Sequence, residues 1–283
     1  WLVRILEYDE WAPKASSHAA RMDRWLQPHL ERQRRQQQHP VIDFLFTYYN
    51  HRPSALRRWH PGPGVALRAA TEYAALKGYA PLGDAVTVSP SYVESQRPLI
   101  AGIHRLLVAT RDRAASYGCF GLHEWAMVYR LEETRHPLPL RLGAAGTDRV
   151  VESHRIACSH FDAYRFFTEP ARPLNTLNPG RDNRPDFEQP GCLHASMDLY
   201  KHAYRLSPML PSDLVAETFE LAIQIREVDM RASPYDLSAL DYTAIAIETP
   251  EGKAEYAAQQ RAFSSSAAHL RNQLIGICEQ LLS

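Results

Sequence analysis

Apolar residues recur at helical spacing through most of this chain, and that pattern limits the fold more than any other feature of the sequence. Leu214 and Ile225 lie on one face of a helix of at least four turns. Thr249 and Pro250 form the start signal of a last helix, which we expect to run to the C-terminal end. Alternation of apolar and polar residues, which is typical of strands, is almost absent. We therefore predict an all-α fold.

The expected organisation is a single multi-helix domain. Residues 1–38 are predicted to form an N-terminal helical arm, and residues 39–283 a helical core domain. Within the core, residues 65–76 are expected to be helical and residues 81–90 to be a short strand or an extended loop. The segment 169–192 contains five prolines, which predicts a long irregular loop.

Composition excludes several classes of protein. Lys and Arg together number 32, as do Asp and Glu, so the chain is not a strongly basic, non-specific binder of nucleic acid. The four cysteines form no CxxC pair, which argues against a disulfide framework or a zinc knuckle. No apolar run reaches membrane-spanning length and no signal peptide is evident, so we expect a soluble, cytoplasmic protein without a membrane partner.

Familiar nucleotide and hydrolase motifs are also missing. The sequence has no P-loop, no GxGxxG after a strand, no GxSxG and no deaminase signature. P-loop, nicotinamide and α/β-hydrolase chemistry are therefore not expected.

A cluster of imidazoles and carboxylates indicates a metal site. His194 and Asp198 are one turn apart on a predicted helix, so they share a face. His160 and Asp162 supply two more ligands if their backbone is extended. Together the four side chains suit iron, manganese or zinc. The alternative is that these histidines cap helices and bridge acidic or tyrosine side chains in a polar core.

Two further carboxylates stand in apolar surroundings. Glu124 lies inside an aromatic helix, where burial raises the pKa of an unpaired acid and tunes it for acid–base catalysis. Asp229 ends a long helix and is a candidate to face a cationic substrate. The structural alternatives are an ion pair between Glu124 and an arginine, and a turn clamped by Asp229 and Arg231.

The segment around residues 56–64 joins cations to an aromatic ring and a Gly-containing turn. Backbone N–H groups after such a turn bind phosphate, Arg57 and Arg58 add charge, and Trp59 can stack on a base. The alternative is a rigid surface turn with exposed arginines.

Four segments carry a resemblance to a known family. They are residues 39–49 (HPVIDFLFTYY), 57–62 (RRWHPG), 120–130 (FGLHEWAMVYR) and 229–236 (DMRASPYD). From Pro40 to Gln259 the chain resembles a family of actinobacterial proteins commonly labelled 3-methyladenine DNA glycosylase. The resemblance implies hydrolysis of the N-glycosidic bond of a modified, alkylated and cationic nucleobase, in DNA or in a nucleoside, with no cofactor.

That activity implies a division of roles among the residues. An extruded base would stack between aromatic rings, which also attract its positive charge. A carboxylate would stabilise the developing sugar cation or activate water; the candidates are Glu124, Asp162 and Asp229. Contacts to the base and its backbone are expected from Tyr48, Tyr49, Arg57, Arg58, Trp59, His60, Trp125 and Tyr164.

Three functions therefore compete at this point. The first is the N-glycosidic-bond hydrolase. The second is a metal-dependent helical enzyme acting on a small metabolite, with Fe, Mn or Zn held by His160, Asp162, His194 and Asp198. The third is a helical binding protein without catalytic activity.

Overall fold

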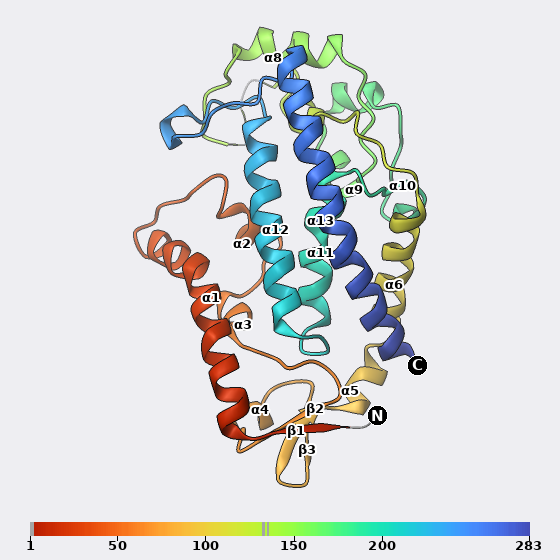
Figure 1. Cartoon of the computed structure of the whole chain (residues 1–283). Helices are drawn as coiled ribbons and strands as arrows, with labels where there is room; N and C mark the ends of the chain where they lie inside the picture. The colour runs from red at the N-terminus through yellow and green to blue at the C-terminus, as the bar shows by residue number, and fades with distance from the viewer. Residues whose placement is uncertain (1–2, 132–133, 135) are drawn as a thin grey trace. The chain divides into compact units, whose positions relative to one another are not determined.

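The structure, a computed structural model, describes residues 3–131, 134 and 136–283, and this part of the chain is mostly helical (Figure 1). It divides into two compact units. Unit 1 contains the described residues up to Arg105, with Leu199–Glu220 and Asn272–Ser283. Unit 2 contains the described residues of 106–198, with Leu221–Arg271. The predicted predominance of helix is confirmed, whereas the expectation of a fold without a sheet is corrected below.

Unit 1 combines a long N-terminal helix with a small sheet and several short helices. Helix α1 begins one residue after Glu7, whose side chain and that of Glu10 form a capping box. Trp11, Met22 and Leu26 are the buried apolar residues of α1. The elements that lie wholly in this unit are β1 (Arg4–Leu6), α1 (Tyr8–Arg34), α2 (Phe44–Tyr48), α3 (Pro53–Arg57), β2 (Val65–Arg68), α4 (Thr71–Ala74), β3 (Tyr79–Leu82), β4 (Ala85–Val88) and α5 (Pro90–Ser95).

The sheet of unit 1 has four strands in the order β1-β2-β4-β3. Strand β2 pairs in parallel with β1, with Ala66 opposite Ile5, and antiparallel with β4, with Ala66 opposite Thr87. Strands β3 and β4 form a hairpin whose two-residue connection contains Gly83 at a φ of +61°. Of the two alternatives given for residues 81–90, a short strand or an extended loop, the strand is found as β4. The helix expected over residues 65–76 is wrong because this stretch forms β2 and the single turn α4.

Unit 2 is built from short helices and irregular segments. Its own elements are α7 (Leu122–Ala126), α8 (Gly143–Ser153), α9 (Phe161–Tyr164), the 3-10 helix η1 (Glu169–Leu174), α10 (Arg184–Phe187) and the 3-10 helix η2 (Ser238–Leu240). The proline-rich segment 169–192 holds η1 and α10 and is otherwise irregular. It nevertheless buries Glu188 and Gln189. This loop therefore supplies polar groups to the interior of the unit.

Four helices contribute residues to both units. They are α6 (Arg97–Asp112), α11 (Leu193–Leu206), α12 (Ser212–Arg231) and α13 (Pro250–Leu282). The start predicted for α13 is confirmed: the hydroxyl of Thr249 accepts a hydrogen bond from the N–H of Gly252 at 3.0 Å. Gly252 is required there, because a Cβ atom would lie 2.0 Å from the carbonyl oxygen of Ala246.

Among the described residues, none of the helices has both the length and the apolar character needed to cross a bilayer. The expected division of the chain at residue 38 stays a prediction.

Candidate metal centre

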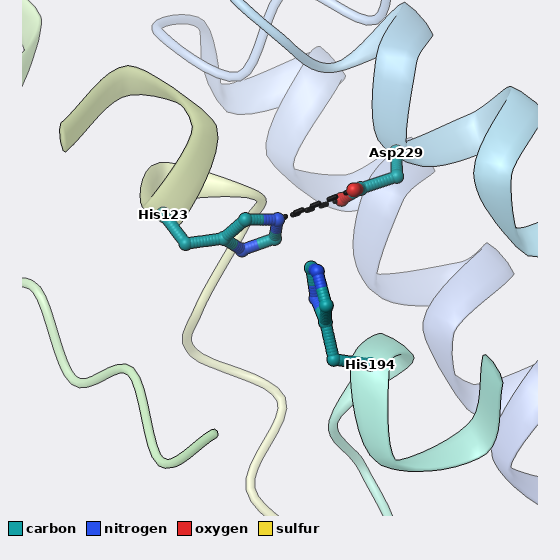
Figure 2. Close-up of side chains that lie close together, drawn as sticks. All are labelled: His123, His194 and Asp229. Atoms are coloured by element: carbon teal, nitrogen blue, oxygen red, sulfur yellow. Dashed lines mark hydrogen bonds and ion pairs between the residues drawn. The ribbon is translucent and has the colours of Figure 1, made fainter. Parts of the chain in front are cut away.

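Two imidazoles and one carboxylate converge in the interior of unit 2 (Figure 2). His123 comes from α7, His194 from the first turn of α11, and Asp229 from the last turns of α12. One ligand atom from each residue lies within 4.8 Å of the others. His123 is 2% exposed, His194 6% and Asp229 1%, so the group is shielded from solvent.

The contact between His123 and Asp229 organises this group. Nε2 of His123 lies 3.1 Å from Oδ1 and 3.2 Å from Oδ2 of Asp229. The ring of His194 stands almost perpendicular to that of His123, at 88°, with the ring centroids 4.5 Å apart. Figure 2 shows the tip of the His194 ring directed toward the His123–Asp229 pair. The two rings thus face one another and a carboxylate in a polar interior.

Burial and neighbouring charges set the protonation states of the three residues. Burial, reinforced by the nearby His123, lowers the pKa of His194 to about 3. Burial raises the pKa of Asp229, but the charge and hydrogen bond of His123, with a smaller contribution from Arg226, outweigh it and hold the pKa at about 2. Burial lowers the pKa of His123, but Asp229 outweighs it and raises that pKa well above its usual value. At neutral pH His194 is therefore neutral and Asp229 is ionised, the states in which both ligate metals.

Glu124 follows His123 in the chain and forms a buried ion pair. Nη1 of Arg226 lies 3.0 Å from Oε1 of Glu124 and 3.7 Å from Oδ2 of Asp229. Arg226 is 1% exposed, so the two carboxylates share one buried guanidinium. This ion pair is the structural alternative that the sequence analysis gave for Glu124. The same guanidinium also lies beside Asp229. The predicted role of Glu124 as an acid or base stays a prediction.

A second group, next to the first, contains three of the four metal ligands predicted from sequence. Ligand atoms of His160, Asp162 and Asp198 lie within 4.8 Å of one another. Nε2 of His160 is 3.2 Å from Oδ2 of Asp198 and 3.5 Å from Oε1 of Glu188. The fourth predicted ligand, His194, belongs instead to the group with His123 and Asp229. Side chains one turn apart on α11 therefore meet different partners.

A small cavity borders the first group. Its volume is about 10 Å³, which is room for roughly one water molecule. The thiols of Cys119, Cys158 and Cys192 and the rings of His123 and His194 are part of its lining. All four cysteines of the chain are free, and Sγ of Cys119 lies 3.7 Å from Nδ1 of His123.

Two glutamines in the lining of the cavity, Gln189 and Gln260, form hydrogen bonds with the backbone around it. Oε1 of Gln189 accepts hydrogen bonds from the N–H groups of Ser116 at 2.8 Å and Gly191 at 2.7 Å. Nε2 of Gln260 donates to the carbonyl of Gly191 at 2.6 Å. The proline-rich loop is in this way tied to α13 and to the segment before α7.

Most residues expected to contact a nucleobase lie in unit 1, whereas the lining of this cavity comes from unit 2. Tyr48 stacks on Phe44, and Tyr49 packs edge-on against Tyr200. The guanidinium of Arg57 binds Asp23 at 2.8 Å. Of the remaining expected contact residues in unit 1, Arg58 is exposed, and Trp59 and His60 are buried.

Two of the expected contact residues lie in unit 2. Trp125 is fully buried, and its ring N–H donates to the carbonyl of Ala232 at 2.9 Å. Tyr164 packs against Phe167. Neither lines the small cavity, and the substrate-binding roles of all these residues stay predictions.

Sequence reasoning missed His123, Glu188 and Arg226 as members of the site. A signal for His123 was present, because it directly precedes Glu124 in an apolar, aromatic stretch where each polar side chain needs a partner. No protein-family model, curated protein or solved structure matches this chain.

Proposed function

We propose that the protein is a metal-dependent enzyme acting on a small metabolite, with a divalent ion held by His123, His194 and Asp229. The observation that carries the proposal is the convergence of their ligand atoms within 4.8 Å in a buried position. Two histidines with one carboxylate are the donor set of non-haem Fe(II) enzymes, and a similar set holds catalytic zinc. Fe(II) is the ion that we favour, with Mn(II) and Zn(II) as the alternatives.

The surroundings of the three donors suit an ion. Metal-binding side chains are generally oriented by an outer layer of hydrogen bonds and charges. Here Cys119 contacts the ring nitrogen of His123 that faces away from Asp229, and the guanidinium of Arg226 stands 3.7 Å from Asp229. Binding of the ion would release the proton that His123 holds against Asp229.

The cavity suggests how the centre would work. When bound, an ion with this donor set supplies a Lewis acid and, in the case of iron, a redox centre. The cavity at His123 and His194 has room for about one water-sized molecule, far less than the roughly 300–1,000 Å³ of common small-molecule pockets. We therefore propose that this space takes water or dioxygen, while a larger substrate needs a rearrangement of the lining.

Metal analysis of the purified protein tests the proposal. After reconstitution with Fe(II) under anaerobic conditions, the wild type should retain at least one ion per chain. His194→Ala and Asp229→Asn should lose that ion, whereas His269→Ala, which changes an exposed histidine of α13, should keep it. Retention by His194→Ala at the wild-type level, or a wild type that holds no ion, would overturn the proposal.

An N-glycosidic-bond hydrolase acting on a modified, cationic nucleobase is the second candidate. The observation that favours it is that two of the predicted catalytic carboxylates, Glu124 and Asp229, share the guanidinium of Arg226. Its test is binding of the apo-protein to alkylated duplex DNA at several salt concentrations. Phosphate contacts would make the affinity fall steeply with salt, while undetectable binding at low salt would remove this candidate.

A further inference from the structure

We propose that the centre is dinuclear: a second divalent cation binds to His160, Asp162 and Asp198, beside the ion of the first group. The second set of ligands is distinct from the first, although calling the centre dinuclear rests on the proposed function. The structural basis is the group of ligand atoms within 4.8 Å of one another, in which Asp198 is 1% exposed and His160 fully buried.

The state of His160 is the observation that points to a ligand. Neither of its ring nitrogens makes a hydrogen bond, and the ring is 0% exposed. Leaving a buried polar group unsatisfied destabilises the folded state. Nε2 nevertheless lies 3.2 Å from Oδ2 of Asp198 and 3.5 Å from Oε1 of Glu188. A cation bound between this nitrogen and these oxygens would satisfy the ring nitrogen that no hydrogen bond satisfies.

The charged groups around this site are compatible with an added cation. Arg184 donates to Oδ2 of Asp198 at 2.9 Å and to Oε1 of Glu188 at 2.5 Å, and it lies 3.8 Å from Asp162. Arg165, on the solvent side, lies 3.4 Å from Asp162. Each carboxylate has further lone pairs, so Arg184 can orient the ligands from the outer layer and leave room for direct coordination.

The same arginine defines the competing explanation, in which Arg184 alone balances the carboxylates and no ion binds. In that case His160 would be a buried imidazole whose hydrogen bonds are simply missing. The experiment below separates the two explanations.

The two groups of ligands are neighbours within unit 2. The rings of His160 and His194 are 5.4 Å apart between centroids. Cys158 and Ser159, which directly precede His160, line the same small cavity as His123 and His194. Paired ions at such a centre bind one small substrate between them and stabilise charge on both of its ends. A bridging, oxygen-containing ligand is therefore expected at the centre.

Equilibrium binding of Mn(II) to the apo-protein, read by metal content and by electron paramagnetic resonance, tests the inference. The wild type should bind two ions per chain and give the signal of a spin-coupled pair. Asp162→Asn and Asp198→Asn should bind one ion, with the second at least ten-fold weaker and the coupled signal lost. Asp162→Asn should disturb the fold less than Asp198→Asn, because the side chain of Asp162 is 12% exposed. Asp182→Asn, which changes an exposed residue of the proline-rich loop 169–192, is the control and should bind two ions.

The outcomes separate this inference from the proposed function. One ion per chain that His194→Ala abolishes and Asp162→Asn leaves in place would overturn the second site and keep the first. One ion that depends on Asp162 and Asp198 but not on His194 would overturn the dinuclear centre and the proposed function together. No bound ion in any variant would overturn both. Circular dichroism of each variant confirms that the fold is retained.

Discussion

Nε2 of His123 lies within 3.2 Å of both carboxylate oxygens of Asp229, although 106 positions separate the two residues in the chain. Both side chains are at least 97% buried. Removing only one partner of a buried ion pair is strongly destabilising, because the other charge is left without compensation. This single contact thus links the stability of unit 2 to the ligand set of the proposed metal centre.

The first prediction concerns Asp229→Asn, which keeps the size of the side chain and removes its charge. In metal-free protein we expect a loss of about 3–5 kcal/mol in the free energy of unfolding. Urea denaturation measures this loss. Asp241→Asn, in an exposed C-cap position at a φ of +60°, is the matched control and should be nearly neutral. Equal stability of Asp229→Asn and the wild type would show that the pair contributes nothing.

The second prediction concerns removal of the ion. A ligand that binds only the folded state stabilises it by about 2.7 kcal/mol at a hundred times its Kd. Chelation with EDTA should therefore lower the Tm of the reconstituted wild type by about 5 °C or more, given the usual few degrees per kcal/mol. The Tm of His194→Ala should fall less than that of the wild type, because this variant lacks the ion of the first group, while that of His269→Ala should fall as in the wild type. A wild-type Tm indifferent to EDTA contradicts the metal centre.

The third prediction is a pH dependence that originates in unit 1, whereas the proposed metal ligands belong to unit 2. Burial, with smaller contributions from Arg58 and His18, lowers the pKa of His60 to about 3. Between about pH 6.5 and pH 3, His60 is therefore mostly protonated in the unfolded chain and mostly neutral in the folded chain. The stability that neutral His60 contributes is present above pH 6.5 and is lost as the pH falls toward 3, which amounts to about 2 kcal/mol at pH 5.

The variant His60→Gln isolates this effect and can keep the hydrogen bond to the hydroxyl of Tyr79, 2.8 Å from Nδ1. Its free energy of unfolding should fall less than that of the wild type between pH 7 and pH 5. His269→Gln should follow the wild-type curve. Parallel curves for His60→Gln and the wild type would mean that His60 is protonated in the folded state as readily as in the unfolded state.

The fourth prediction tests the backbone contact beside the cavity. A Cβ atom on Gly191 would lie 2.4 Å from the carbonyl oxygen of Ser116. Gly191→Ala should therefore cost about 1–3 kcal/mol, because this backbone must move and disturb the bonds of Gln189. Gly118→Ala, where the space around the added atom is open, should be neutral. Fluorescence-monitored urea unfolding compares them; no difference between the two would show that the loop shifts freely.

Local signals in the sequence were enough to find the long helices. The apolar spacing from Leu214 to Ile225 and the cap at Thr249 act within a few residues; the first lies in α12, and α13 starts where predicted. The sheet escaped prediction because its strands have three or four residues and because β2 is fixed by pairing with Arg4–Leu6, about sixty positions away. Short apolar stretches such as Val65–Arg68 fit a helix and a strand equally well.

Only part of the candidate site could be predicted from the sequence. His160, Asp162 and Asp198 were chosen for their residue types, and the structure brings their ligand atoms together. His123 was overlooked because nothing near it in the chain indicates Asp229 as its partner. Spacing along α11 suggested that His194 and Asp198 act together, but position along the helix axis gives each its own group.

The threading of the chain through its two units limits how this protein can be dissected. Helices α11, α12 and α13 each begin in one unit and end in the other, so the chain passes between the units repeatedly. No single truncation can release either half intact. A nick by a protease within any of these helices would break an element to which both units contribute, and expression of a fragment carrying only the histidines and aspartates of the centre would require redesigned connections.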